Sequence, residues 1–343
     1  MKPFRELSRR GRLFRLRKLA NQSLKSYGLM DAHLNFIQYS QNIIYRVDCP
    51  GGIPMGGIAD CFVPNRFVLR ILASSDADMI ASELAWLAAL STEGGLPVPA
   101  PVPNTDGELV IKIKTDGIPA GRMVSLMHWL DGRRLHARFK PKHFTALGQT
   151  VARLHAFSYG WQPPAGFDRP HWDWDSQLGG SMFRHPMADV VATIPEKFQQ
   201  PFHTISSEGR DAMERLGKGP DAYGLIHADL YPENILFKDN RALPIDFEDC
   251  GYGYWMWDIA VALCEWAWGP EWEIIRDAFW DGYSSIRTLP DTQWSLLDLF
   301  IAIQFATMVL WSSALLINDP KRIGEYEPWR NKVGNQLLGY FKL

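Results

Sequence analysis

The sequence has few cysteines and little net charge, and both shortages argue against particular classes of protein. Its four cysteines show neither a dense pattern nor the spacing of metal-binding thiolates, so a disulfide scaffold and a zinc module are not expected. Reduced thiols are typical of the cytoplasm, which is the expected location. A formal net charge of −2 gives no reason to expect nucleic-acid binding.

Internal repeats and low-complexity tracts are also missing from the sequence. A length of 343 residues with 46% hydrophobic content exceeds what one small core needs. We therefore expect two lobes that share a cleft.

The basic segment at residues 5–18 lacks the apolar run of a signal peptide. It carries seven basic residues. Apolar residues recur on one helical face, at Leu13, Leu16, Ala20 and Leu24. We expect a helix packed on the small lobe. A membrane-surface or nucleic-acid-binding arm is the alternative.

Residues 299–317 contain no formal charge and are long enough to span a bilayer. Polar side chains such as Gln304 and Ser312 dilute this segment. We expect a fully buried helix of the large lobe and no stable membrane insertion, with a membrane span as the alternative.

Three polar residues follow His227 at defined spacing: Asp229, Asn234 five positions later, and Asp246 twelve beyond that. Transfer of a phosphoryl group from a nucleotide needs a base for the acceptor hydroxyl and oxygen ligands for Mg²⁺. Asp229 suits the base, and Asn234 and Asp246 offer oxygen atoms to the metal. The pattern predicts a phosphoryl-transfer site.

Short apolar runs surround these residues and predict strands at 223–226, 234–237 and 242–245. Lys238 to Arg241 is expected to be a turn, because Asp and Asn tolerate the left-handed conformation. Such a hairpin would bring Asn234 and Asp246 together. The alternative is that the three polar residues are ordinary turn formers.

The motif His227-x-Asp-x-x-x-x-Asn-Ile-Leu, with the later Ile245-Asp-Phe-Glu, resembles the aminoglycoside phosphotransferase and choline kinase superfamily. The resemblance implies a two-lobed, protein-kinase-like α+β fold, with an antiparallel sheet in the small lobe and a larger, mostly helical lobe. It also implies ATP-dependent transfer of the γ-phosphoryl group to a hydroxyl of a small molecule, such as an aminoglycoside, an amino alcohol or homoserine. GTP is an alternative donor, and Mg²⁺ is the expected metal.

On this resemblance, residues 1–126 form the nucleotide-binding lobe, 127–131 the hinge and 132–343 the catalytic and substrate-binding lobe. Backbone groups near Met127 and Trp129 would face the adenine.

Arg70 lies in a predicted strand at 66–72, and Glu83 lies in a predicted helix at 77–90. The resemblance places Arg70 on the nucleotide phosphates, with an ion pair to Glu83 that orients it. The alternative is a surface Arg and a solvated Glu.

The expected phosphate loop, residues 38–47, contains no glycine. Ser40 and Asn42 lie in its centre and are the candidate phosphate donors, with a plain polar hairpin turn as the alternative. The glycines within residues 51–57 are interpreted as a loop between strands.

Three further residues are expected to support the site. In the family, an Asp like Asp258 holds the catalytic loop from the following helix, where a carboxylate can accept several N–H bonds. The alternative is a helix N-terminal Asp. His227 is expected to fix the loop by hydrogen bonds, and His155 to satisfy a helix end.

The segments expected to bind the acceptor are rich in tryptophan and contain several acidic residues, Glu248, Asp249, Glu265 and Glu271. Aromatic faces and carboxylates attract ammonium groups, which favours a cationic acceptor. The tryptophans are Trp161, Trp172, Trp174, Trp255, Trp257, Trp266, Trp268, Trp272 and Trp280. The alternative is that they fill the core.

Two other functions stay open: a Ser/Thr protein kinase, and a kinase-fold regulatory protein that binds nucleotide without turnover. Only eleven residues separate Asp246 from Asp258, which leaves no obvious activation segment and favours small acceptors.

Overall fold

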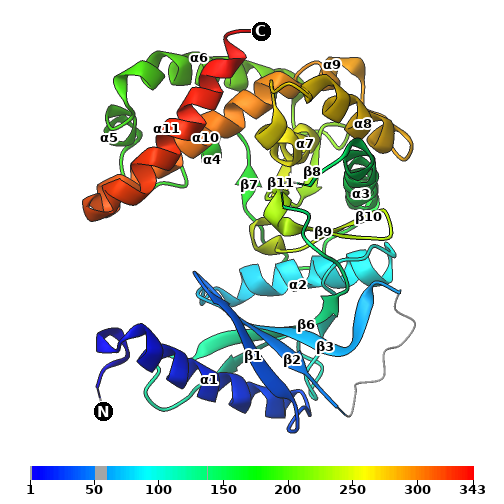
Figure 1. Ribbon diagram of the computed structural model, residues 1–343, viewed down its shortest axis with the longest axis vertical. Helices are drawn as coiled ribbons and strands as arrows, with labels where there is room; N and C mark the ends of the chain where they lie inside the picture. Colours follow the sequence, from blue (N-terminus) through cyan, green and yellow to red (C-terminus); the bar gives the residue numbers. More distant parts are fainter. Residues whose placement is uncertain (1, 51–59, 137) are drawn as a thin grey trace. The chain divides into compact units, whose positions relative to one another are not determined.

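The computed structural model describes residues 2–50, 60–136 and 138–343 (Figure 1). The predicted loop at residues 51–57 lies outside the described residues. The chain forms two compact units. Unit 1 comprises Met1–Arg133, Gln162–Asp168 and Leu243–Glu248. Unit 2 comprises Arg134–Trp161, Arg169–Ala242 and Asp249–Leu343.

Unit 1 is built on an antiparallel sheet in the order β1-β2-β3-β6-β4, with β5 also paired to β6. Burial alternates along β2, as expected for a strand with one face on the core. The strands are β1 (His33–Tyr39), β2 (Ile43–Asp48), β3 (Phe62–Ile71), β4 (Pro101–Val102), β5 (Val110–Ile113) and β6 (Arg122–Leu130).

The helices of unit 1 are η1 (Phe4–Glu6), α1 (Arg9–Ser26) and α2 (Ala77–Thr92). Ser8 caps α1 by accepting a 3.2 Å hydrogen bond from the Gly11 N–H. Leu16, Ala20 and Leu24 of α1 are buried in the same core as β1 to β3. The predicted helix on the small lobe is therefore confirmed, although Leu13 is only half-buried.

Unit 2 is mostly helical. Its helices are α3 (Pro141–Gly160), α4 (Trp174–Gln177), α5 (Met187–Ala192), α6 (Glu196–Leu216), α7 (Trp255–Leu263), α8 (Trp272–Ser284), α9 (Asp291–Trp294), α10 (Leu297–Asn318) and α11 (Ile323–Tyr340). Short 3₁₀ helices are η2 (Pro232–Asn234), η3 (Phe247–Asp249, which bridges the two units), η4 (Cys264–Trp266) and η5 (Pro320–Arg322). The backbones of α3 and α8 approach closely, because a Cβ on Gly148 would lie 2.1 Å from the Phe279 carbonyl oxygen.

Two small sheets hold the predicted motif. β7 (His171–Trp172), β11 (Gly251–Tyr254) and β8 (Tyr223–Ile226) form one, and β9 (Ile235–Lys238) pairs with β10 (Arg241–Pro244) in the other. Asp239 and Asn240 join β9 to β10 with φ of 47° and 61°, which confirms the predicted left-handed turn.

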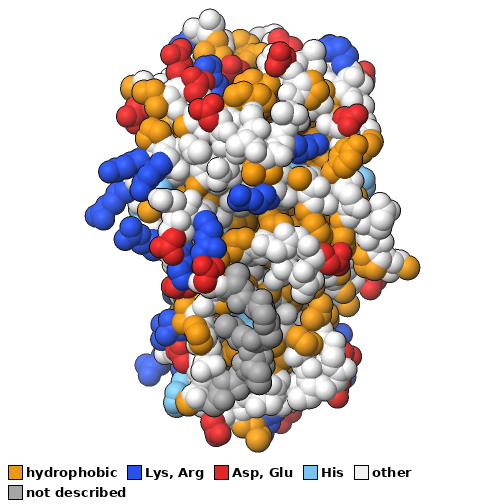
Figure 2. Space-filling view, turned by 90° about the vertical axis from the view of Figure 1, so that its right-hand side faces the viewer, with side chains coloured by type: hydrophobic (Ala, Val, Ile, Leu, Met, Phe, Trp, Pro, Cys, Tyr) orange, Lys and Arg blue, Asp and Glu red, His pale blue; other side chains and the backbone are white. Residues whose placement is uncertain are grey.

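Helix α10 is the apolar segment whose environment the sequence left open. By length and composition it is long enough to cross a membrane, but 72% of its apolar window is buried inside the protein. Most of α10 therefore lies in the core of unit 2, as expected, but the helix is not fully buried, because Trp311 is 40% exposed. On the face in Figure 2, basic and acidic side chains occur together, in keeping with the small net charge.

Candidate active site

Asp258 holds the loop that follows β8. Its carboxylate is fully buried in the first turn of α7. It accepts hydrogen bonds from the backbone N–H of His227 at 2.9 Å and of Ala228 at 2.6 Å. Ala228 has φ of +69°, a left-handed conformation that is unfavourable for a residue with a Cβ. The two bonds stabilise this conformation just before Asp229, as the sequence predicts for Asp258.

His155 supports Asp258 from α3. Its Nε2 lies 3.2 Å from Asp258 Oδ2, and its Nδ1 lies 2.9 Å from the Tyr283 hydroxyl. Complete burial lowers the pKa of His155, against the opposite effect of Asp258. The imidazole contacts Asp258 and Tyr283 and not the end of α3, so it supports the residue that holds the loop.

Asp229 and Asn234 are in direct contact within unit 2. Asn234 ends η2 and donates from Nδ2 to the Asp229 backbone oxygen at 3.0 Å and to its carboxylate Oδ2 at 2.5 Å. The Asp229 N–H donates to His227 Nδ1 at 3.3 Å, in keeping with the loop-fixing role expected of His227. With Nδ2 turned toward Asp229, the atom that Asn234 offers to a cation is its amide oxygen.

Asp246 belongs to unit 1 together with the buried ion pair of Arg70. Arg70 donates to Glu83 through two bonds of 2.8 and 3.0 Å, and the two side chains are 4% and 2% exposed. The predicted ion pair is therefore present, and the alternative of solvated surface residues is wrong.

Several carboxylates stabilise the charged form of Arg70. Burial lowers the pKa of this guanidinium, but Glu83, Asp246 and Glu248 outweigh burial and hold the pKa above its usual value. Asp246 follows β10 with φ of +66° and is exposed. An exposed carboxylate beside a buried guanidinium suits a site that binds a cation and phosphate together.

Asn42 lies at the tip of the β1–β2 hairpin, where the phosphate loop was expected. Its Oδ1 accepts a 2.8 Å bond from the Ala73 N–H, and its Nδ2 donates to the Glu248 carboxylate. Burial, the largest effect, raises the pKa of Glu248. The Asn42 side chain therefore fixes the turn, whereas Ser40 is exposed.

The expected hinge differs from the observed backbone. β6 continues to Leu130, which pairs with Phe62, so Met127 and Trp129 are strand residues. The His128 N–H also donates to the Ala100 oxygen at 2.9 Å. Because β6 is hydrogen-bonded on both sides, the strand includes four of the five residues expected to form the hinge, 127–130.

The described residues contain no group of three or more His, Cys, Asp or Glu side chains that could hold a metal alone. A Mg²⁺ that takes oxygen ligands from one carboxylate, one amide and nucleotide phosphates does not require such a group. The amide oxygen of Asn234, in unit 2, and the exposed carboxylate of Asp246, in unit 1, each offer oxygen atoms of the kind that Mg²⁺ prefers.

Most of the tryptophans have structural roles. Trp255 and Trp257 are fully buried, Trp266 packs on Phe144, and Trp280 stacks on Trp294 with ring centroids 4.1 Å apart. Trp255 and Trp257 are therefore core residues, as the alternative interpretation held, and Trp266 and Trp280 are partly buried and pack against the core.

Sequence reasoning named Glu265 but missed Tyr231, Gln304 and Glu233. The Gln304 amide donates to the Tyr231 hydroxyl. Burial raises the pKa of Tyr231, and the charges of Asp229 and Glu265 raise it further. Burial raises the pKa of Glu265, and the nearby Glu233 raises it further. Glu233 directly precedes Asn234 in the His227 motif, so its position in the sequence could have indicated a carboxylate near the site.

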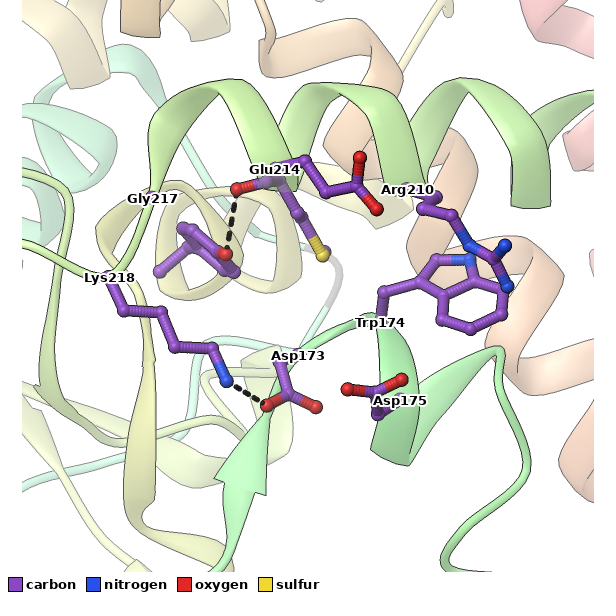
Figure 3. Close-up of a pocket in the computed structure, with 9 residues that line it drawn as sticks. Asp173, Trp174, Asp175, Arg210, Glu214, Gly217 and Lys218 are labelled. Atoms are coloured by element: carbon purple, nitrogen blue, oxygen red, sulfur yellow. Dashed lines mark hydrogen bonds and ion pairs between the residues drawn. The ribbon is translucent and has the colours of Figure 1, made fainter.

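A separate pocket of unit 2 is lined by residues of α4 and α6 (Figure 3). Lys218 and Asp173 form a 2.7 Å ion pair, and the Arg210 guanidinium lies 3.5 Å from the centre of the Trp174 ring. The Tyr254 hydroxyl donates to the Met213 oxygen at 3.0 Å. None of these contacts involves the residues proposed for phosphoryl transfer.

Comparison with known proteins identifies the family of this chain. The model of the phosphotransferase enzyme family matches residues 62–294, more than half of the sequence. The chain belongs to this family. It therefore transfers phosphoryl groups from ATP to a hydroxyl of a small molecule, and the fold is the two-lobed, protein-kinase-like one.

Individual relatives are small-molecule kinases. The chain is 24% identical to the amicoumacin kinase of Bacillus subtilis over 265 residues, which cover 76% of this chain and 70% of the relative. It is 27% identical to the homoserine kinase of Methylobacillus flagellatus over 258 residues, 73% of each chain. The structure of a microcompartment-associated aminopropanol kinase superposes with a TM-score of 0.74 and 26% identity, covering 94% of both chains.

Proposed function

We propose that this kinase uses Asp229 as its catalytic base, and Asn234 and Asp246 as its Mg²⁺ ligands. Residues 1–126 bind the nucleotide, 127–131 connect the lobes, and 132–343 bind the acceptor. The observation that supports the roles most directly is the contact between Asn234 and Asp229 in a loop held by Asp258.

Each residue contributes one part of the transfer. Asp229 orients the acceptor hydroxyl and takes its proton as the phosphoryl group moves through a loose transition state. Arg70, oriented by Glu83, neutralises the nucleotide phosphates. Ser40 and Asn42 shape the turn beside the phosphates, and backbone groups near Met127 and Trp129 face the adenine. Bound Mg²⁺ supplies charge neutralisation on the transferred phosphate. ATP is the donor, with GTP as the alternative to be tested.

The acceptor in this proposal is a small hydroxylated molecule that carries an amine. Burial and the nearby charge of Glu233 raise the pKa of Glu265, and burial together with the charges of Asp229 and Glu265 raises the pKa of Tyr231. An ammonium group between two carboxylates is stabilised by both. Two relatives are named for hydroxylated amines, aminopropanol and homoserine. The reaction takes place in the cytoplasm.

An acceptor panel tests this function. ADP release with Mg²⁺ is measured for amino alcohols, homoserine and aminoglycosides, each beside a matched alcohol without the amine, such as aminopropanol against propanediol. We expect turnover to depend on the amine, and this dependence to be lost in Glu265→Gln but kept in Glu273→Gln, an exposed control. Equal rates with and without the amine would contradict the proposal that the acceptor is cationic. Nucleotide binding with no turnover on any acceptor would favour the regulatory alternative.

A further inference from the structure

A second pocket, entirely within unit 1, has a strongly basic lining. Its volume is about 670 Å³, within the range of small-molecule sites. Arg5 of η1, Arg12 of α1, Lys112 of β5 and Arg122 of β6 line it, together with the serines at positions 74 and 75. None of the lining residues is acidic.

The four cations have no protein partner among the described residues. No hydrogen bond or ion pair joins their side chains to any of these residues, and the Nε atoms of Arg12 and Arg122 are buried without an acceptor. Buried donors are usually satisfied, and an exception calls for an explanation. Four like charges around one hollow also repel one another.

In the pocket of Figure 3, by contrast, the basic side chains have protein partners. There, Lys218 is neutralised by Asp173 at 2.7 Å, and Arg210 stacks on Trp174. The cations of the unit 1 pocket come from four separate elements and lack such compensation, which an anionic ligand would supply.

We propose that this pocket binds a small molecule with a diphosphate group. The guanidinium groups of Arg12 and Arg122 can each donate two parallel bonds to phosphate oxygens. Lys112 and Arg5 add charge at the exposed side. Ser74 Oγ accepts a bond from the Asp76 N–H, so its hydroxyl proton remains to be donated to the ligand. Several cations on different elements match a multiply charged group better than a single carboxylate.

This site is separate from the nucleotide site proposed above. Arg70 and Glu83 do not line the pocket. Its wall does include Tyr39 and Ala73, beside the turn that Asn42 fixes, so the experiment must distinguish the two sites.

The test is calorimetric titration of the full chain with inorganic pyrophosphate in magnesium-free buffer, with and without saturating ADP. The variants are Arg12→Gln/Arg122→Gln and Arg5→Gln/Lys112→Gln. The control is Arg9→Gln/Arg10→Gln, which removes the same charge from exposed positions of α1 outside the pocket.

We expect the wild-type protein to bind pyrophosphate equally well with and without ADP. Both pocket variants should bind at least tenfold more weakly, and the control should stay within twofold of wild type. No binding by the wild type, unchanged binding by the pocket variants, or competition by ADP would each overturn the proposal. If Arg12→Gln/Arg122→Gln does not fold, Arg5→Gln/Lys112→Gln decides, because both of its changes are at exposed side chains.

Discussion

Asp258 Oδ1 accepts a 2.6 Å hydrogen bond from the backbone N–H of Ala228, the residue directly before Asp229. The same carboxylate accepts from His227, so it replaces the solvent that two buried N–H groups would otherwise need. The position of Asp229 therefore depends on a residue that is itself fully buried.

Replacing Asp258 with Asn should impair turnover more than nucleotide binding. The amide nitrogen cannot accept a hydrogen bond, and one unsatisfied buried N–H costs about 1–3 kcal/mol. We expect kcat to fall about tenfold or more, with the affinity for ADP little changed, in steady-state kinetics and calorimetry. Asp291→Asn, at an exposed position early in α9, is the matched control. A wild-type kcat in Asp258→Asn would contradict the supporting role.

Replacing Glu83 with Gln should destabilise the protein strongly. The change leaves Arg70 buried without its charge partner, which typically costs about 3–5 kcal/mol. Urea denaturation measures the free energy of unfolding. Glu325→Gln breaks the exposed pair with Arg322 and should produce no measurable loss. Similar results for the two variants would show that the Arg70 pair is not effectively buried.

Stability should decrease as the pH falls below about 6.5, in part because of His155. Burial lowers the folded-state pKa of His155, so the unfolded chain binds a proton at a pH where the folded chain does not. The contribution is present above the unfolded pKa and is lost as the pH falls toward the folded one.

The variant His155→Gln should be less stable at pH 7.5 but lose less stability between pH 7.5 and 5.5. His203→Gln, at an exposed position, should lose as much as the wild type. Burial also lowers the pKa of His128, so part of the pH dependence of stability should remain in His155→Gln. An unchanged pH dependence in His155→Gln would contradict the assignment.

The core position of α10 predicts a large loss of stability at one of its aromatic residues and a small loss at another. Phe300 is fully buried, and Phe300→Ala should cost about 3–5 kcal/mol in the free energy of unfolding. Trp311 is 40% exposed, and Trp311→Ala should cost much less. Recovery of the wild-type protein in the membrane fraction would indicate instead that α10 inserts into lipid.

Local sequence signals were sufficient for much of the catalytic segment. The apolar run Tyr223–Ile226 became β8 with the predicted bounds, and Asp239 and Asn240 formed the left-handed turn. These elements depend on neighbouring residues, so a pattern over a few positions predicts them. The Arg70–Glu83 pair also depends on a strand and a helix that lie close in sequence.

Other features depend on partners far away in the chain. Asn42 contacts Glu248 across 206 positions, and no local pattern connects them. The residues proposed as the hinge lie largely in a strand, because β6 pairs on both sides beyond Met127. The basic pocket joins Arg12 to Arg122, whereas the sequence indicated only an amphipathic basic helix.

Asp229→Asn tests the central claim most directly, with Asp239→Asn in the exposed turn between β9 and β10 as its control. Single-turnover phosphoryl transfer and ADP binding are measured on both variants. We predict that Asp229→Asn slows transfer about 10²–10⁴-fold while ADP binds within twofold of wild type, and that the control matches wild type. Transfer by Asp229→Asn at the wild-type rate would contradict the account.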